Sequence, residues 1–256
     1  TYRFVFFALA LMLSGSLQEK EANIVTLSKT WAAPEPASPE NTFPDKEKLY
    51  FGVYSNVIRA GQGEMFYAGI DQKTGTPLQR LRFRVSTFSV KDEEDILGTI
   101  DFRAPVLVVR AVRVFGKSES IQETYAPDRR SVTIRKTVNG KAVEDSKIVS
   151  RNDLGNVLLL VYRLRNDASL AVGRSYDINL PTQQFKLKVV DKRMLKSPLG
   201  RFEAFYLEST PPKFKIWLRT TPDRLPLRIQ GLIAGGMLYL ATTRASVEPS
   251  AATASS

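Results

Sequence analysis

The amino-acid sequence predicts a mainly β fold: an antiparallel open or incomplete β-barrel of about 11–12 strands wrapped around one principal helix. Hydrophobic and polar residues alternate with period two through most of residues 46–245. Turn signals separate these runs at short intervals, and only one segment has a helical period. So many antiparallel strands usually curl or close to hide their edges, which favours a single barrel-like domain over residues 46–245.

The expected strands begin with an aromatic, β-rich run and end beyond a pair of glycines. Arg59–Gly63 is expected to be the first hairpin turn, and Asn139–Gly140 is a strong two-residue turn signal. Gly235–Gly236 precedes the last strand. The clearest alternation predicts strands at 49–57, 64–70, 80–85, 132–138, 175–180, 185–189, 213–219, 224–229 and 237–243.

One segment has the spacing of a helix. Asn152–Asp153 can cap it, and apolar residues recur three and four positions apart from Leu154 to Tyr162. Because the segment is apolar nearly all round, a helix near Asp153–Arg165 would be buried inside the barrel. A strand over Val157–Leu164 is the alternative.

The N-terminus has the layout of a secretory signal peptide. Arg3 precedes a short apolar run, Phe4–Leu13, and small polar residues follow it. The run is shorter than the ~20 residues that span a bilayer. We therefore expect a signal peptide at 1–22, a Pro-rich linker at 23–45, a disordered tail at 246–256 and a periplasmic location without a transmembrane span.

Composition excludes several kinds of chemistry. The sequence has no cysteine and no histidine, so it forms no disulfide, no thiolate or Cys/His zinc site, and no Ser-His-Asp triad. The acidic run Asp92–Asp95 lacks calcium-loop spacing and is expected in a solvated turn or at a helix start. No cofactor, metal site or catalytic residue is expected; a carboxylate-based hydrolase is the residual enzymatic alternative.

The net charge of +11 favours anionic partners. Since export is expected, these would be an anionic lipid, lipopolysaccharide or an acidic glycan rather than nucleic acid. A basic surface that serves solubility alone is the simpler interpretation. The sequence does not predict an oligomeric state.

Several short motifs occur in the order and spacing of a known family. They lie at 49–61, 152–164, 170–176, 197–202, 214–218 and 223–229. With these motifs, the chain resembles the bacterial domain of unknown function family 3108 over about 43–244. The resemblance implies an exported or envelope protein of mainly antiparallel β structure, with an open barrel like the lipoprotein carriers LolA and LolB by analogy, and it carries no catalytic residues.

A cationic face with one tryptophan is the candidate ligand site. Alternation along 213–219 places its polar residues and Trp217 on one face, and a neighbouring strand can add Arg228. A tryptophan among cations can stack on a sugar ring while the cations hold an anion. A solvated sheet face with Trp217 as packing is the alternative. The candidate residues are Lys213, Lys215, Trp217, Arg219 and Arg228.

Arg80, Arg82 and Arg84 form a second basic stripe, which we expect on the outer barrel surface. The sequence as a whole therefore predicts a non-enzymatic periplasmic binding or carrier protein for an amphiphilic or anionic envelope ligand. In the carrier form, an acyl chain would enter a cavity as the central helix leaves. In the alternative form, an envelope glycan would bind the outer aromatic and cationic face.

Overall fold

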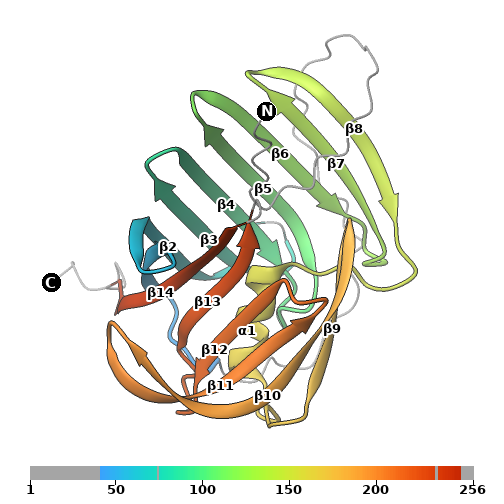
Figure 1. The fold of residues 1–256 in the computed structure, drawn as a ribbon. Coiled ribbons are helices and arrows are strands. Elements are labelled where there is room, and N and C mark those ends of the chain that lie inside the picture. Colours follow the sequence, from blue (N-terminus) through green and yellow to red (C-terminus); the bar gives the residue numbers. More distant parts are fainter. Residues whose placement is uncertain (1–40, 74, 234–235, 249–256) are drawn as a thin grey trace, which may run out of the picture.

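One antiparallel sheet organises the part of the chain that the structure describes (Figure 1). The structure is a computed structural model, and it describes residues 41–73, 75–233 and 236–248. The strand order is β8-β7-β6-β5-β4-β3-β2-β1-β14-β13-β12-β11-β10-β9, and no pairing in these ranges joins β8 to β9. The open, mainly β barrel predicted from the sequence is confirmed. The strands are β1 (Glu47–Ser55), β2 (Ile58–Asp71), β3 (Leu78–Thr87), β4 (Val90–Gly98), β5 (Pro105–Val114), β6 (Lys117–Tyr125), β7 (Ser131–Val138), β8 (Lys141–Val149), β9 (Ser175–Leu180), β10 (Gln183–Ser197), β11 (Gly200–Thr210), β12 (Phe214–Arg219), β13 (Pro226–Ile233) and β14 (Gly236–Val247).

The sheet consists of two runs of sequential hairpins. The first meander is β1–β8 and the second meander is β9–β14. The pairing of β1 with β14 joins them. The described residues hold fourteen strands, more than the 11–12 expected. The excess arises because strands such as β4 carry charge on both faces, which hides their alternation.

The first hairpin turn differs from the one expected. Residues 56–57 make the turn, and Asn56 has a positive φ of 53°. The predicted turn, Arg59–Gly63, lies inside β2 instead. Gly61 is needed there for close strand approach, because a Cβ atom would lie 2.2 Å from the Ser86 carbonyl oxygen. The Asn139–Gly140 turn is confirmed, with positive φ at both residues.

The expected helix is present as α1 (Val157–Asn166), and the alternative strand is not formed. It begins four residues later than expected, because the side chain of Asn156 accepts hydrogen bonds from the amides of Leu158 and Leu159. The residues before it are held extended, with the Leu154 amide donating to the Arg129 carbonyl. Within the described ranges, no helix is long and apolar enough to cross a membrane.

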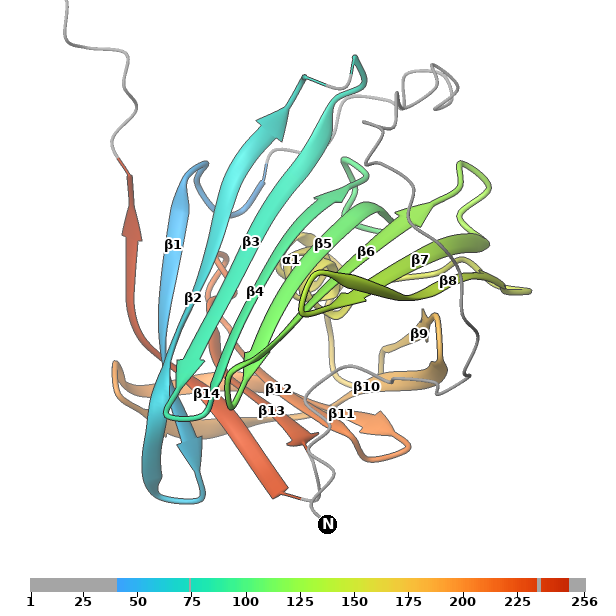
Figure 2. The ribbon, with the colours of Figure 1, turned by 90° about the horizontal axis from the view of Figure 1, so that it is seen from above.

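Helix α1 lies inside the curve of the sheet and packs on both meanders (Figure 2). Leu159 and Tyr162 belong to a cluster with the first meander, whereas Leu160, Val161 and Leu164 belong to a cluster with the second. All five side chains are buried. The helix is therefore the central layer between two sheet halves, as its apolar circumference predicted.

The folded domain extends beyond both expected boundaries. Phe43, assigned to the linker, is 3% exposed and packs edge-on against Tyr67 and Tyr162. At the other end, β14 continues to Val247, which lies inside the predicted tail and pairs with Glu47 of β1. The burial of the Phe43 ring moves the start of the domain into the predicted linker, and the β1–β14 hydrogen bonds move its end into the predicted tail. The predicted signal peptide, the linker before residue 41 and the tail after residue 248 lie outside the described residues.

Candidate functional site

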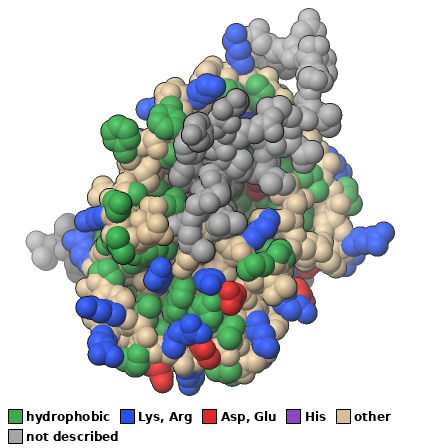
Figure 3. All heavy atoms as spheres, in the orientation of Figure 1, with side chains coloured by type: hydrophobic (Ala, Val, Ile, Leu, Met, Phe, Trp, Pro, Cys, Tyr) green, Lys and Arg blue, Asp and Glu red, His purple; other side chains and the backbone are tan. Residues whose placement is uncertain are grey.

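The candidate cationic residues share the face of the second meander opposite to that of Phe214, Ile216 and Leu218, and the Trp217 ring of this face joins the buried cluster that also holds Leu159 and Tyr162. Phe214, Ile216 and Leu218 of β12 lie in the cluster that includes α1. Period-two alternation therefore turns Lys215, Trp217 and Arg219 to the opposite face. On β13, Arg228 pairs with Trp217. Lys and Arg side chains gather around hydrophobic ones in the lower part of Figure 3, over the second meander.

Aromatic and cationic side chains cross this face in one row. Tyr206 pairs with Trp217, and Trp217 pairs with Arg228. The Arg228 guanidinium lies 3.7 Å from the ring centroid of Tyr239 and 5.1 Å from that of Trp217, both within cation–π range. Tyr239 stacks on Tyr54 at 5.0 Å. We call this set the aromatic–cationic row: Arg193, Tyr206, Trp217, Arg228, Tyr239 and Tyr54.

Within this row, the Trp217 side chain is a buried packing residue and does not offer its ring to a ligand. Its side chain is 7% exposed, and its ring lies 5.1 Å from the Tyr206 ring. Arg228 covers it from the neighbouring strand. Because the indole is covered from both neighbouring strands, a sugar ring has no free indole face to stack on. The sequence predicted which face the tryptophan lies on, but the neighbours that bury it come from other strands.

Most of the cations on this face already have a polar partner. The Lys213 ammonium donates to the Gln183 side-chain oxygen at 2.6 Å. The partners of the other three are carboxylates: Lys215 with Glu208 at 3.2 Å, Arg193 with Asp191 at 2.8 Å, and Arg219 with Asp223 through a bidentate contact. Neutralised pairs of this kind are weak attractors for a further anion.

Arg228 differs from these four cations. Among the described residues it makes no ion pair, and its buried Nε has no hydrogen-bond partner. Burial lowers the pKa of the Arg228 guanidinium, although Tyr239 opposes this. A partly desolvated charge without a counter-ion costs free energy that an anion at the same place would recover.

A second polar cluster, not predicted from the sequence, lies on the inner face of the first meander. The acidic run Asp92–Asp95 forms part of β4 and not a turn or a helix start. Strand alternation splits it, so Asp92 and Glu94 point inward while Glu93 and Asp95 pair with outer arginines. Reading 90–98 as a strand would have revealed two inward carboxylates.

The inner cluster binds α1 through Glu94. The Asn156 side-chain amide donates to Glu94 at 3.0 Å, and the Arg110 guanidinium makes a bidentate contact with Asp92 at 2.8 and 2.5 Å. Desolvation raises the pKa of Glu94 to about 7, while Arg110 and Asn156 oppose the shift. Desolvation also raises the pKa of Glu123, whose carboxylate accepts from Tyr125 at 2.6 Å. No three acidic groups in the described ranges are placed to hold a metal ion.

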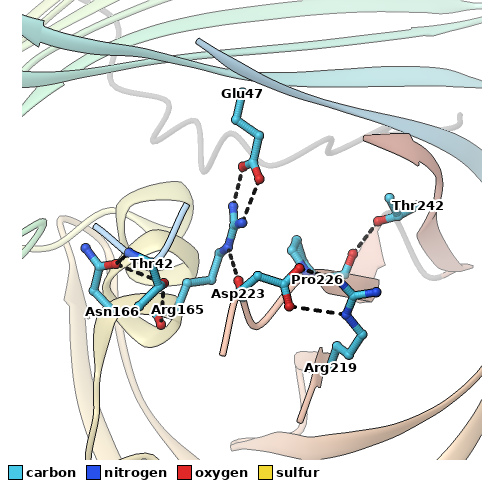
Figure 4. Close-up of polar contacts among 8 residues, drawn as sticks. All are labelled: Thr42, Glu47, Arg165, Asn166, Arg219, Asp223, Pro226 and Thr242. Carbon is cyan, nitrogen blue, oxygen red and sulfur yellow. Dashed lines mark hydrogen bonds and ion pairs between the residues drawn. The ribbon is translucent and has the colours of Figure 1, made fainter. Parts of the chain in front are cut away.

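Helix α1 is fastened at its other end by a buried ion pair (Figure 4). The Arg165 guanidinium donates to both carboxylate oxygens of Glu47, at 2.5 and 2.8 Å, and Arg165 is fully buried. Its Nε also donates to the Asp223 carbonyl at 3.2 Å. The Arg224 guanidinium donates to carbonyls at the helix end, including that of Asp167. The helix is thus tied to β1 and to the β12–β13 connection.

The predicted outer stripe and a surface depression lie on the first meander. Arg80 and Arg82 pair with Asp95 on the outer face, and Arg84 pairs with Glu93. A shallow open depression of about 490 Å³ is lined by residues 68–73 together with Arg80 and Arg82.

The geometry defines a class: an open antiparallel barrel filled by one helix, with a cationic outer face. No family model matches the chain, so the resemblance to family 3108 stays a prediction. No curated protein sequence matches it either. Three of the solved structures that the chain resembles share 7%, 8% and 9% sequence identity with it.

The first is a β-barrel-like protein of domain of unknown function DUF1849 from Brucella abortus, with 7% identity, a TM-score of 0.49, and coverage of 80% of this chain and 98% of that one. The second is a candidate exported protein with a YmcC-like fold from Bacteroides fragilis, with 8% identity, a TM-score of 0.29, and coverage of 79% and 96%. The third is a candidate lipoprotein from Parabacteroides distasonis, with 9% identity, a TM-score of 0.31, and coverage of 80% and 98%. All three TM-scores lie below 0.5, and the fold described above stands on this chain's own strand pairing.

Proposed function

We propose that the chain is a non-enzymatic binding protein that holds an anionic group at the aromatic–cationic row, with Arg228 as its principal contact. The observation that carries the proposal is that, among the described residues, Arg228 has no ion-pair partner and its buried Nε has no hydrogen-bond acceptor. Its charge is partly desolvated between Trp217 and Tyr239, and no carboxylate in the described ranges neutralises it. An anionic oxygen would supply both the counter-charge and the missing hydrogen-bond acceptor.

The ligand class follows from the expected location of the protein. The signal-peptide layout at 1–22, the net charge of +11 and the resemblance to family 3108 support a periplasmic protein that meets envelope anions. The acidic head group of a lipid, lipopolysaccharide or an acidic glycan has the required chemistry. Because Trp217 is covered, recognition rests on the anionic group and not on sugar stacking.

The packing around α1 favours the outer face over an interior carrier cavity. An acyl chain could enter the barrel only if α1 left, as the carrier form requires. That movement would break the Arg165–Glu47 pair and expose Leu159, Tyr162 and Leu164, which are fully buried. Separating a buried ion pair alone costs ~3–5 kcal/mol. The outer site needs no such rearrangement.

The test is calorimetric titration of the purified protein with two probes, an oligogalacturonate and a short-chain phosphatidylglycerol below its micelle concentration. A charge-assisted hydrogen bond contributes ~1.5–3 kcal/mol, so Arg228→Gln should weaken binding by about tenfold to 100-fold. Arg135→Gln is the matched control, because this exposed cation lies on the first meander, outside the row, and already pairs with Asp145. Binding should also weaken as salt rises.

Thermal unfolding of both variants separates loss of binding from loss of fold. Equal affinity of Arg228→Gln and the wild-type protein for the probes would contradict the proposal, as would failure of the wild-type protein to bind either one. Binding of only one probe would identify the ligand as glycan or lipid.

A further inference from the structure

Four hairpin turns of the first meander lie along one end of the sheet. The register places them together, since Gly61 pairs with Thr87, Val90 with Val114, and Glu119 with Val138. Both ribbon views show the turns in a line, at the upper left in Figure 1. We call this line the hairpin edge, and it comprises residues 55–59, 86–91, 113–118 and 137–141.

Large hydrophobic side chains project from three of these four turns. Phe88 is fully exposed, and Val57 is 90% exposed. Ile58 and Phe115 are 71% and 66% exposed. Scattered exposed hydrophobic residues are ordinary, but here they occupy the tips of neighbouring hairpins.

The backbone conformation of these turns does not require large hydrophobic residues. Tight two-residue turns favour Asn-Gly, which the fourth turn has. Phe115 takes the same position in the third turn with a positive φ of 46°, where a bulky residue is strained. Strain kept at an exposed site indicates a role outside the fold of the turn.

The charge of the hairpin edge is entirely positive. Its segments contain five cations and no acidic residue. In the described part of the chain, none of the five forms an ion pair. The turns at the other end carry Asp71, Asp101 and Asp128 among their cations. The five cations are Arg59, Lys91, Arg113, Lys117 and Lys141.

We propose that the hairpin edge docks on an anionic lipid bilayer. The hydrophobic tips would enter the boundary between head groups and acyl chains, while the five cations contact anionic head groups. Separate projecting tips suit a soft lipid surface better than the continuous flat patch of a protein interface. This surface is on the first meander and is independent of Arg228, so the two proposals can fail separately.

The experiment is co-sedimentation of the purified protein with vesicles of phosphatidylcholine alone or of equal parts phosphatidylcholine and phosphatidylglycerol. We expect retention on the anionic vesicles only, and loss of retention at high salt. The double substitution Val57→Ser/Ile58→Ser should weaken retention by at least about tenfold, because two side chains lose the gain of burial in lipid. Lys91→Gln/Lys117→Gln should weaken it by about 30-fold.

Matched control variants carry the same changes at the opposite end of the sheet. Val149→Ser/Ile70→Ser removes a valine and an isoleucine that are 75% and 50% exposed, and Lys73→Gln/Lys147→Gln removes two exposed lysines. Both controls should bind like the wild-type protein, and circular dichroism should show all variants folded. Equal binding of edge and control variants would overturn the proposal. A change of oligomeric state in the Val57→Ser/Ile58→Ser variant, without a change in vesicle binding, would assign the surface to self-association instead.

Discussion

Glu94 illustrates how one inward side chain can give the fold a dependence on pH. Its pKa of about 7 in the folded chain lies above the ordinary value of 4.5, so the folded state binds this proton more tightly than the unfolded state does. The resulting stabilisation is complete below about pH 4.5 and is lost as pH rises through about pH 7. The raised pKa of Glu123 acts in the same direction.

We therefore expect Glu94→Gln to become progressively more stable than the wild-type protein between about pH 5 and about pH 8, reaching a difference of about 1–3 kcal/mol. Glutamine keeps the oxygen that accepts from Asn156 but cannot ionise. Urea unfolding across this range measures the difference. Glu93→Gln, on the outer face of the same strand, is the control. A constant difference between Glu94→Gln and the wild-type protein would show that Glu94 does not titrate in this window.

Helix α1 depends on one ion pair that the sequence does not reveal. Glu47 and Arg165 are 118 positions apart, and their meeting depends on how the helix docks against β1. Arg165→Met leaves Glu47 buried without a partner and should cost ~3–5 kcal/mol. The double variant Glu47→Leu/Arg165→Met, which removes both charges, should lose less than the Arg165→Met single variant.

A double-mutant cycle by urea unfolding measures this coupling. Additive losses in the cycle would show that the two side chains do not stabilise each other. Far-ultraviolet circular dichroism of the same variants would report whether α1 itself is lost.

The accuracy of prediction from sequence varied from element to element for physical reasons. Strand β9 matches the predicted range 175–180, because one face is apolar and the other polar. Strand β4 was missed because its carboxylates lie on both faces, where Arg110 and the outer arginines hold them. The cationic face of β12 followed from alternation alone. The burial of Trp217 and the unpaired state of Arg228 did not, because both depend on register between strands.

At the scale of the whole molecule, the β1–β14 pairing is the long-range step of the sheet. Every other ladder in the described residues joins strands that follow one another along the chain. Among the same residues, strands β8 and β9, which α1 separates in sequence, are the two unpaired edges of the sheet. The outer ends of these two strands are adjacent: Glu47 pairs with Val247, and the Glu248 amide donates to the Lys46 carbonyl at 3.0 Å.

This adjacency means that the order of the strands along the chain can be changed without changing the sheet. A circular permutant that links residue 248 to residue 46 through a short glycine-rich turn, and opens the exposed segment at Arg151–Asn152, would run from α1 through β9–β14 directly into β1–β8. Every strand would then pair with its neighbour in sequence, and the β1–β14 closure would become an ordinary hairpin. The linear chain of residues 46–248 is the reference, because it lacks Phe43 as the permutant does. Since folding slows as contacts become more distant in sequence, the permutant should refold faster than this reference in stopped-flow experiments. Refolding at an unchanged rate would show that β1–β14 closure does not limit folding, and a permutant that cannot fold would show that the 150–156 connection is required to seat the helix.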